Sequence, residues 1–124
     1  NVYFKDLSPG DALHSIDSPS PALDQKRKSR TISSSILSFS LDEIIDSFNL
    51  PSPTIMKLDV DGIELNILEG AKKCLESVNR LMIEVDEHNE ALIKEFLFNQ
   101  GFTISSDYPS HNAKVSNRNI LFCK

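Results

Sequence analysis

The spacing of apolar residues changes along the chain, and this change separates helix-like from strand-like segments. Ser40 is followed three residues later by Glu43, a capping box, and the apolar stripe after it predicts a short helix over residues 41–48. Residues 54–60 then form a short run that is mostly apolar and is interrupted by Lys57. Such a run is typical of a buried strand, so we expect residues 54–60 to be a central strand of a sheet.

A repeating order of helices and strands follows. Residues 63–77 carry an apolar stripe broad enough to pack on a sheet, and residues 80–85 are a second buried run. Asn89 is placed to cap a further helix, which Gly101 ends. Two more strands are expected at residues 102–105 and 119–122. This order predicts an α/β fold with a mostly parallel sheet, whose last strand returns antiparallel and blunts one edge.

The first 36 residues lack this regular order and are rich in serine and proline. We expect an irregular segment with two short strands there, and an edge strand or hairpin arm at residues 31–39, where serines dilute the β-branched residues. We therefore predict a single domain over residues 1–124. Within it, residues 1–36 are the irregular or edge segment and residues 37–124 are the α/β core.

Composition and charge narrow the kinds of partner that the chain could bind. The chain has 124 residues, of which 40% are hydrophobic, and a formal net charge of −5. Its basic run, within residues 26–30, is either a solvated loop or a patch for an anionic partner. An acidic chain without a longer basic stripe is poorly suited to bind nucleic acid.

The sequence also carries signals of location. No apolar stretch approaches the roughly 18–20 residues that a membrane-spanning helix needs, and no charged-then-apolar leader opens the chain, so we expect a soluble, cytoplasmic protein without membrane binding. Cys74 and Cys123 lie in apolar patterns, where cysteine often serves as a small buried hydrophobe, and this fits a reducing compartment. The chain begins with Asn1 and not with Met, which suggests a piece of a longer protein.

Acidic side chains gather where the two buried strands end. At the end of the first strand stand Asp59, Asp61, Gly62 and Glu64, and at the end of the second stand Glu84, Asp86, Glu87 and His88. Ligands of open parallel sheets bind beyond the carboxyl ends of the strands, where loops diverge and helices begin. We therefore expect the two clusters to face one crevice.

Each of these side chains also has a structural interpretation. Strand alternation places Asp59 nearly inside the sheet, where a carboxylate needs partners, but Asp59 could instead pair with Lys57 or cap the next helix. Asp61 and Glu64 could be acids that complement a helix dipole. His88 could be a solvent-facing residue at a helix start.

Metal binding is a further alternative at the strand ends. The spacing of Asp59, Asp61 and glycine invites a calcium-loop interpretation, but that loop would begin at Lys57 and end at Leu68, which supply no anionic oxygen. A magnesium site built from Asp59, Asp61 and Glu84 stays open.

Four segments of the chain resemble one known family. They are KLDVDGIELNILEGA at residues 57–71, RLMIEVDEH at 80–88, SFSLDEII at 38–45 and NQGF at 99–102. Together they resemble the FkbM family of S-adenosylmethionine-dependent methyltransferases over residues 37–104. Asp61 departs from the family, which more often has Glu at that position; the change keeps the charge and shortens the reach.

The resemblance implies a fold and a reaction. It implies a Rossmann-like methyltransferase sheet, and the family's first strands, with the Gly-rich turn and the ribose-binding acid, are missing from this chain, which starts around the third strand. The cofactor implied is S-adenosylmethionine, and the implied reaction is O-methylation of a hydroxyl on a sugar or natural product. The chain alone is expected to be inactive.

The resemblance also implies roles for the strand-end residues. It assigns Asp59 and Glu64 to cofactor binding, with Glu64 as a supporting hydrogen-bond acceptor at the helix start. It makes Asp61, Glu84 and His88 the catalytic candidates. Among these, His88 is the expected base, because an imidazole suits proton removal from a hydroxyl near neutral pH.

Two other functions remain open at this point. The chain could be a noncatalytic α/β module that binds a partner through its acidic crevice or its basic loop, or it could be a magnesium-dependent enzyme. For the methyltransferase, the expected partner is a small-molecule or glycan acceptor. An exposed sheet edge left by the missing strands also predicts a homodimer.

Overall fold

A computed structural model describes residues 2–4, 15–16, 32–60, 62–109 and 117–124. The chain divides into two compact units, Asn1–Ser38 and Phe39–Lys124, and we describe each by itself.

The first unit contains a small antiparallel sheet. Its strands are β1 (Val2–Phe4), β2 (Ser15–Ile16) and β3 (Ile32–Ser34), in the order β2-β1-β3. The two short strands expected in the first 30 residues are β1 and β2. The strand expected at residues 31–39 is shorter than predicted, because β3 ends at Ser34 and residues 35–40 have no regular secondary structure.

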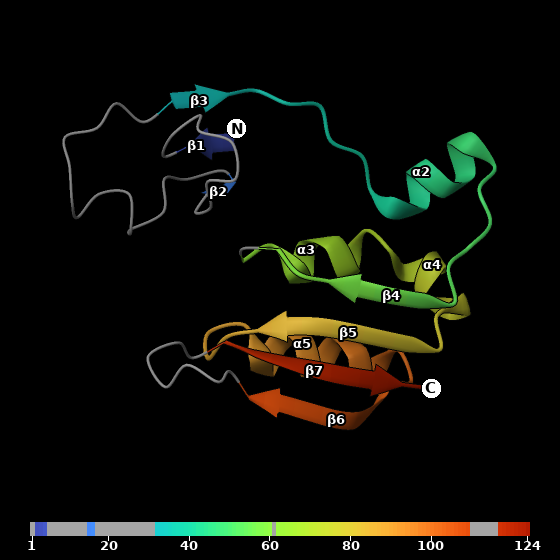
Figure 1. Cartoon of the computed structure of the whole chain (residues 1–124). Coiled ribbons are helices and arrows are strands. Elements are labelled where there is room, and N and C mark those ends of the chain that lie inside the picture. The colour runs from blue at the N-terminus through green and yellow to red at the C-terminus, as the bar shows by residue number, and fades with distance from the viewer. Residues whose placement is uncertain (1, 5–14, 17–31, 61, 110–116) are drawn as a thin grey trace, which may run out of the picture. The chain divides into compact units, whose positions relative to one another are not determined.

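The second unit contains a four-stranded sheet in the order β4-β5-β7-β6. Its strands are β4 (Ile55–Leu58), β5 (Arg80–Val85), β6 (Thr103–Pro109) and β7 (Arg118–Cys123). β4 and β5 are parallel, and β7 is antiparallel to both β5 and β6, so β7 alone runs against the other three (Figure 1). The mixed α/β class and the antiparallel last strand are therefore confirmed.

Two details of the predicted sheet were wrong. Among the described strands, β4 has one neighbour and lies at an edge, although it was expected to be central. The last strand, β7, does not lie at an edge but between β5 and β6. The side chains explain its place: Ile120 and Phe122 of β7 are fully buried, whereas β6 is exposed along almost its whole length, so the polar strand takes the edge.

Within the described residues, this unit has four helices. They are α2 (Leu41–Phe48), α3 (Glu64–Glu69), α4 (Lys72–Ser77) and α5 (Glu90–Asn99). The single helix predicted over residues 63–77 is in fact two, because the helix is interrupted at Gly70 and Ala71. In the part of the chain that the structure describes, no helix is long and apolar enough to cross a membrane.

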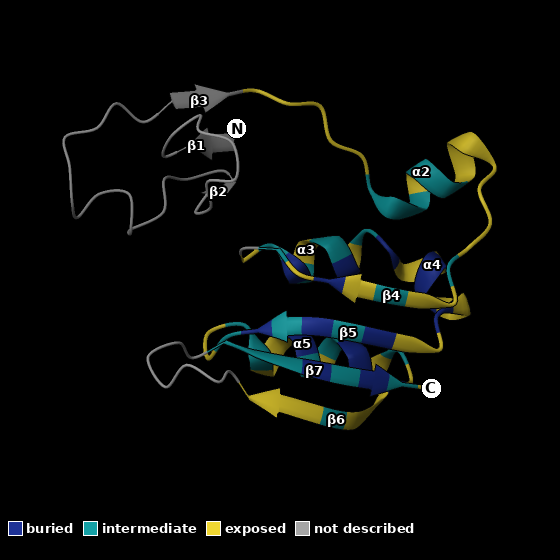
Figure 2. Cartoon of the chain, in the orientation of Figure 1, coloured by how far each residue is buried: buried dark blue, intermediate teal, exposed yellow. Residues whose placement is uncertain are grey.

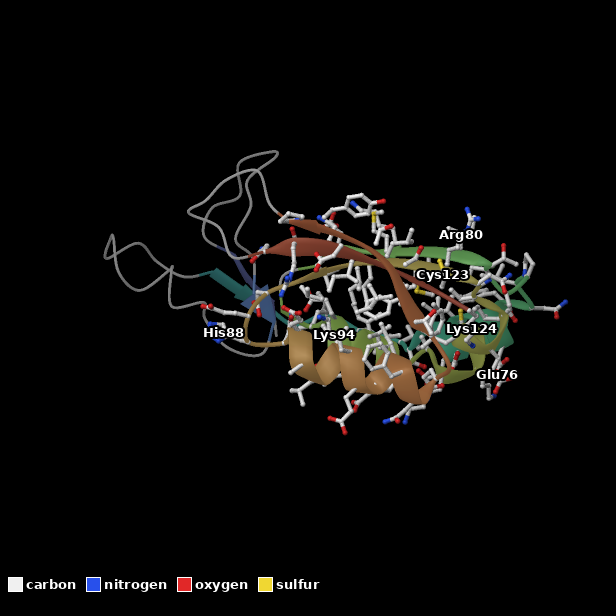
Figure 3. The ribbon with its side chains drawn as sticks, turned by 90° about the horizontal axis from the view of Figure 1, so that it is seen from below. Glu76, Arg80, His88, Lys94, Cys123 and Lys124 are labelled. Carbon is white, nitrogen blue, oxygen red and sulfur yellow. The ribbon has the colours of Figure 1, made fainter. Side chains whose placement is uncertain are left out.

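The helices α3, α4 and α5 cover one face of the four-stranded sheet (Figures 1 and 3). Along β5, Leu81, Ile83 and Val85 are buried, whereas the alternate residues are more accessible (Figure 2). Leu68, Cys74 and Leu75 from the helices join the same core, so the buried role expected for Cys74 is confirmed. The opposite face of the sheet carries Arg80, Met82 and Glu84 and is the more open one.

Helix α2 is joined to the break between α3 and α4. The carboxylate of Asp42 accepts hydrogen bonds from the backbone N–H groups of Lys73, at 3.0 Å, and Cys74, at 2.9 Å. The N–H of Asp42 donates to the carbonyl of Gly70 at 3.1 Å. A Cβ atom on Gly70 would lie 2.9 Å from the Cβ of Ser40, so the close approach of α2 requires glycine there.

The predicted capping box at the start of α2 is present. The N–H of Ser40 donates to Glu43 Oε2 at 2.8 Å, and the N–H of Glu43 donates to Ser40 Oγ at 3.2 Å. The Ser40 hydroxyl also donates to Glu43 Oε2 at 2.8 Å. The bonds from the Ser40 N–H and then from its hydroxyl lower the pKa of Glu43, because they stabilise the charged carboxylate.

Candidate functional site

The carboxyl ends of β4 and β5 lie side by side at the same end of the sheet, because the two strands are parallel and Leu58 pairs with Ile83 near their ends. The loop after β4 leads into α3, and the loop after β5 leads into α5. Figure 3 shows His88 at this end, while Arg80, Cys123 and Lys124 lie at the other end of the sheet. The two acidic segments therefore follow neighbouring strands, as predicted.

Glu64 joins these two loops. It is the only buried charged residue among the described ones, with 3% of its surface exposed. Its Oε1 accepts from the N–H of Gly62 at 3.1 Å, and its Oε2 accepts from Asn89 Nδ2 at 3.0 Å. Because a buried carboxylate needs such donors, the pair of bonds explains how Glu64 is tolerated inside the protein.

Asn89 connects Glu64 to the rest of the loop after β5. Its Oδ1 accepts from the N–H of Asp86 at 2.9 Å. Asp86 Oδ1 in turn accepts from the N–H groups of His88, at 2.8 Å, and Asn89, at 3.0 Å. Asn89 occupies the predicted N-cap position of α5, but its side chain makes no capping bond because both of its polar atoms are already used.

Asp59 is not inside the sheet. Its side chain is 48% exposed and accepts from Lys57 Nζ at 2.5 Å. The expectation of a buried Asp59 was therefore wrong, and the alternative of a pair with Lys57 is what the structure has. The reason is that β4 is an edge strand and that alternation places both side chains on its open face.

Of the three catalytic candidates, the structure describes Glu84 and His88. Asp61 lies outside the described residues. Glu84 is half-buried on the open face of β5, opposite Asn119 of β7. The His88 side chain is 86% exposed, with its Nε2 3.9 Å from Glu87 Oε1. The solvent-facing alternative thus describes where His88 lies.

Metal binding has no support within the described residues, where no group of three or more His, Cys, Asp or Glu side chains is placed to hold an ion. The magnesium trio of Asp59, Asp61 and Glu84 is not tested by this finding, because it includes Asp61.

An ionic cluster lies beside the carboxyl end of β5 and was not predicted from the sequence. Glu90, at the start of α5, accepts from Lys94 Nζ at 2.5 Å and from Arg118 Nε at 3.1 Å, and Arg118 Nη1 also donates to Asp107 at 3.2 Å. The bonds from Lys94 and then Arg118 lower the pKa of Glu90, and the bond with Glu90 raises the pKa of Arg118. The four-residue spacing of Glu90 and Lys94 was a signal that could have found half of this cluster.

We compared the sequence with models of known protein families. The model of the methyltransferase FkbM domain matches residues 5–104. The chain belongs to this family. The resemblance inferred from the sequence motifs is therefore confirmed, and the chain is an FkbM-type methyltransferase domain or part of one.

One curated relative is the hexuronic acid methyltransferase AglP of Haloferax volcanii. It is 40% identical to this FkbM-type chain over 53 residues, which are 43% of the chain and 22% of AglP. The match thus spans about a fifth of the length of that relative. No solved structure matches the chain.

Proposed function

We propose that this chain is part of an S-adenosylmethionine-dependent methyltransferase with a Rossmann-like sheet, which methylates a hydroxyl group of a sugar or natural product. The family match supports methyl transfer. A sugar acceptor is supported by AglP, which is named as a methyltransferase of hexuronic acids.

The observation that carries the proposal is the polar connection between the two strand ends. Glu64 bonds to Gly62 in one loop and to Asn89 in the other, at the edge of a sheet where such folds bind ligands. Methyl transfer from a sulfonium needs mainly alignment, since S-adenosylmethionine supplies a methyl group that is already activated. Acidic residues held by hydrogen bonds at the carboxyl ends of the strands suit that task.

The strand-end residues fit a cationic cofactor in different ways. Asp59 has an accessible carboxylate at the end of β4, which can attract a positive group. Glu64 is buried and both of its oxygens accept hydrogen bonds, so we assign it the role of holding Gly62 rather than a direct contact. This is the supporting role at the helix start that its position suggested.

The acceptor would lie beyond the end of β5. Asp61 and Glu84 are proposed to orient its hydroxyl, and His88 is proposed as the base that removes the hydroxyl proton. The exposed imidazole is open to an incoming substrate. In this scheme the β5 loop provides the proton acceptor and the β4 loop provides the acidic edge.

Calorimetry with S-adenosylhomocysteine tests the proposal. The chain and the longest natural product that contains it are titrated side by side, and we expect the longer protein to bind. Asp59→Asn should weaken that binding about tenfold, as expected for loss of one charged contact. Asp46→Asn, which removes an exposed acid from α2, is the matched control and should have no effect.

Methyl transfer itself is then measured with hexuronic acids and neutral sugars as acceptors, using mass spectrometry of the products. A gain of one methyl group on a hydroxyl supports the proposal. Absence of S-adenosylhomocysteine binding by every natural form of the protein contradicts it and favours the noncatalytic module.

A further inference from the structure

We propose that Asn89 is a positioning residue for methyl transfer, and that its amide and the buried Glu64 carboxylate form a clamp between the loops after β4 and β5. The role rests on the proposed function. It adds a residue that holds the two loops in register without touching the substrate.

Each hydrogen bond of the clamp has a fixed donor and a fixed acceptor. Glu64 presents only acceptors, and it meets two donors: the N–H of Gly62 at 3.1 Å and Asn89 Nδ2 at 3.0 Å. Asn89 Oδ1 is directed to the N–H of Asp86 at 2.9 Å, so the amide orientation is fixed from both sides. An amide is therefore needed at position 89 and two acceptors are needed at position 64.

Burial makes this bond consequential. Glu64 is 3% exposed, so water does not reach its carboxylate while the loops keep their places. An unpaired buried carboxylate is costly, and the loops must then move apart or admit water. The N–H of Gly62 also donates to the carbonyl of Val60 at 3.1 Å, so both of its hydrogen bonds stay between residues close in sequence. The bond from Asn89 Nδ2 to Glu64 is therefore the one that links the two loops.

The clamp reaches the proposed base through the loop backbone. Asp86 holds the N–H groups of His88 and Asn89, and Asn89 holds the N–H of Asp86. A shift of Asn89 therefore displaces the segment that carries His88. An ordinary capping role does not account for the contacts, since the Asn89 side chain makes no capping hydrogen bond to α5.

An exchange of the two side chains tests the clamp. Asn89→Asp places two carboxylates against each other, and Glu64→Gln sets an amide N–H₂ against one of the two donors. The double variant E64Q/N89D restores every bond: the new glutamine donates to the new aspartate and still accepts from Gly62. Its net charge equals that of the original protein. Glu69→Gln, an exposed acid on the same helix, is the charge control.

The first measurement uses the chain alone and does not depend on methyl transfer. Backbone hydrogen exchange is followed at Gly62 in the Asn89→Asp variant and at Asp86 and His88 in the Glu64→Gln variant. We expect about tenfold faster exchange across the loop from each single change, and recovery to within about twofold in the double variant. Additive loss in the double variant overturns the clamp.

The second measurement uses the longer protein at a temperature well below unfolding. We expect each single change to lower kcat about tenfold or more with little effect on the KM for S-adenosylmethionine, and E64Q/N89D to recover most of the rate. Rescued exchange with an unchanged kcat in the single variants overturns the positioning role. If the unmodified longer protein neither binds cofactor nor transfers methyl, the proposed function fails, and with it the positioning role, while the exchange result still decides whether the clamp exists.

Discussion

Asp42 and Glu64 are two carboxylates in the first turns of helices, and each accepts two hydrogen bonds. Asp42, on α2, bonds to two consecutive backbone N–H groups at the start of α4. Glu64, on α3, bonds to one backbone N–H and to one side-chain amide, Asn89, and these lie in different loops. Asp42 is half-buried and Glu64 is buried.

The comparison separates a structural joint from a candidate site. Asp42 accepts hydrogen bonds from free N–H groups at the start of α4 and so fixes where α2 lies, at a distance from the carboxyl ends of the strands in the fold (Figure 1). Glu64 fixes two strand-end loops relative to one another. Both acids belong to segments that resemble the family, so a motif residue can serve either purpose, and the partners decide which.

Leu68→Ala should have the largest effect, because both carboxylates depend on the helix pair α3 and α4. Leu68 is fully buried on α3. Its truncation leaves a cavity, and we expect a loss of about 2–5 kcal/mol in the free energy of unfolding, measured by urea denaturation. Leu92→Ala on α5, where the residue is 55% exposed, is the control. Equal losses in both variants would show that the core does not centre on α3.

Gly70→Ala tests the close approach on which the Asp42 joint depends. The new methyl group would meet Ser40 at 2.9 Å, and we expect a loss of about 1–3 kcal/mol, the usual range for overpacking. Ser40→Gly in the same chain removes the clashing Cβ at small cost to the cap, so S40G/G70A should regain part of the stability. A stable Gly70→Ala variant would mean that α2 sits farther from the break than described.

The Asp42→Asn variant tests whether Asp42, in contrast to Glu64, affects stability alone. One of the two accepted bonds is lost, and we expect about 1–2 kcal/mol lower stability by urea denaturation, with unchanged S-adenosylhomocysteine affinity in the longer protein. Asp46→Asn breaks only an exposed pair with Lys73 and should cost less than about 0.5 kcal/mol. A lower kcat for a fully folded Asp42→Asn variant would show that Asp42 contributes to the candidate site and not only to the position of α2.

Glu90→Gln gives the smallest expected effect and carries a pH signature. Hydrogen bonds from Lys94 and Arg118 lower the pKa of Glu90 from its usual 4.5, so its stabilising contribution is present above pH 4.5 and is lost as the pH falls through the lowered value. We expect the variant to be about 1 kcal/mol less stable at pH 7, with a difference that shrinks under acid. A constant difference from pH 7 to pH 3 would contradict this assignment.

The sequence was informative where local chemistry decides the structure. The capping box of Ser40 and Glu43 and the strand over residues 80–85 depend on neighbours in sequence, and both are present as predicted. The need for glycine at position 70 depends on Ser40, which is 30 positions away, so it could not be inferred from helical periodicity.

The candidate site was predictable in outline and not in its contacts. Parallel pairing brought the two acidic segments to one edge, as expected. The exposure of Asp59 follows from the edge position of β4, and the role of Asn89 follows from a contact with Glu64 across 25 positions. Neither the exposure of Asp59 nor the contact of Asn89 can be predicted from the residue pattern of a single strand or helix.

The place of β7 sets an order of events during synthesis. Of the described strands, β6 pairs with β7 alone, so residues 103–109 have no partner in the sheet until residues 118–123 have emerged from the ribosome. β4 and β5 can pair earlier, because both precede α5. A nascent chain stalled before Arg118 would therefore hold a two-stranded parallel sheet with a polar, unpaired strand beyond it, and the core side chains Ile120 and Phe122 would close the sheet in a single late step.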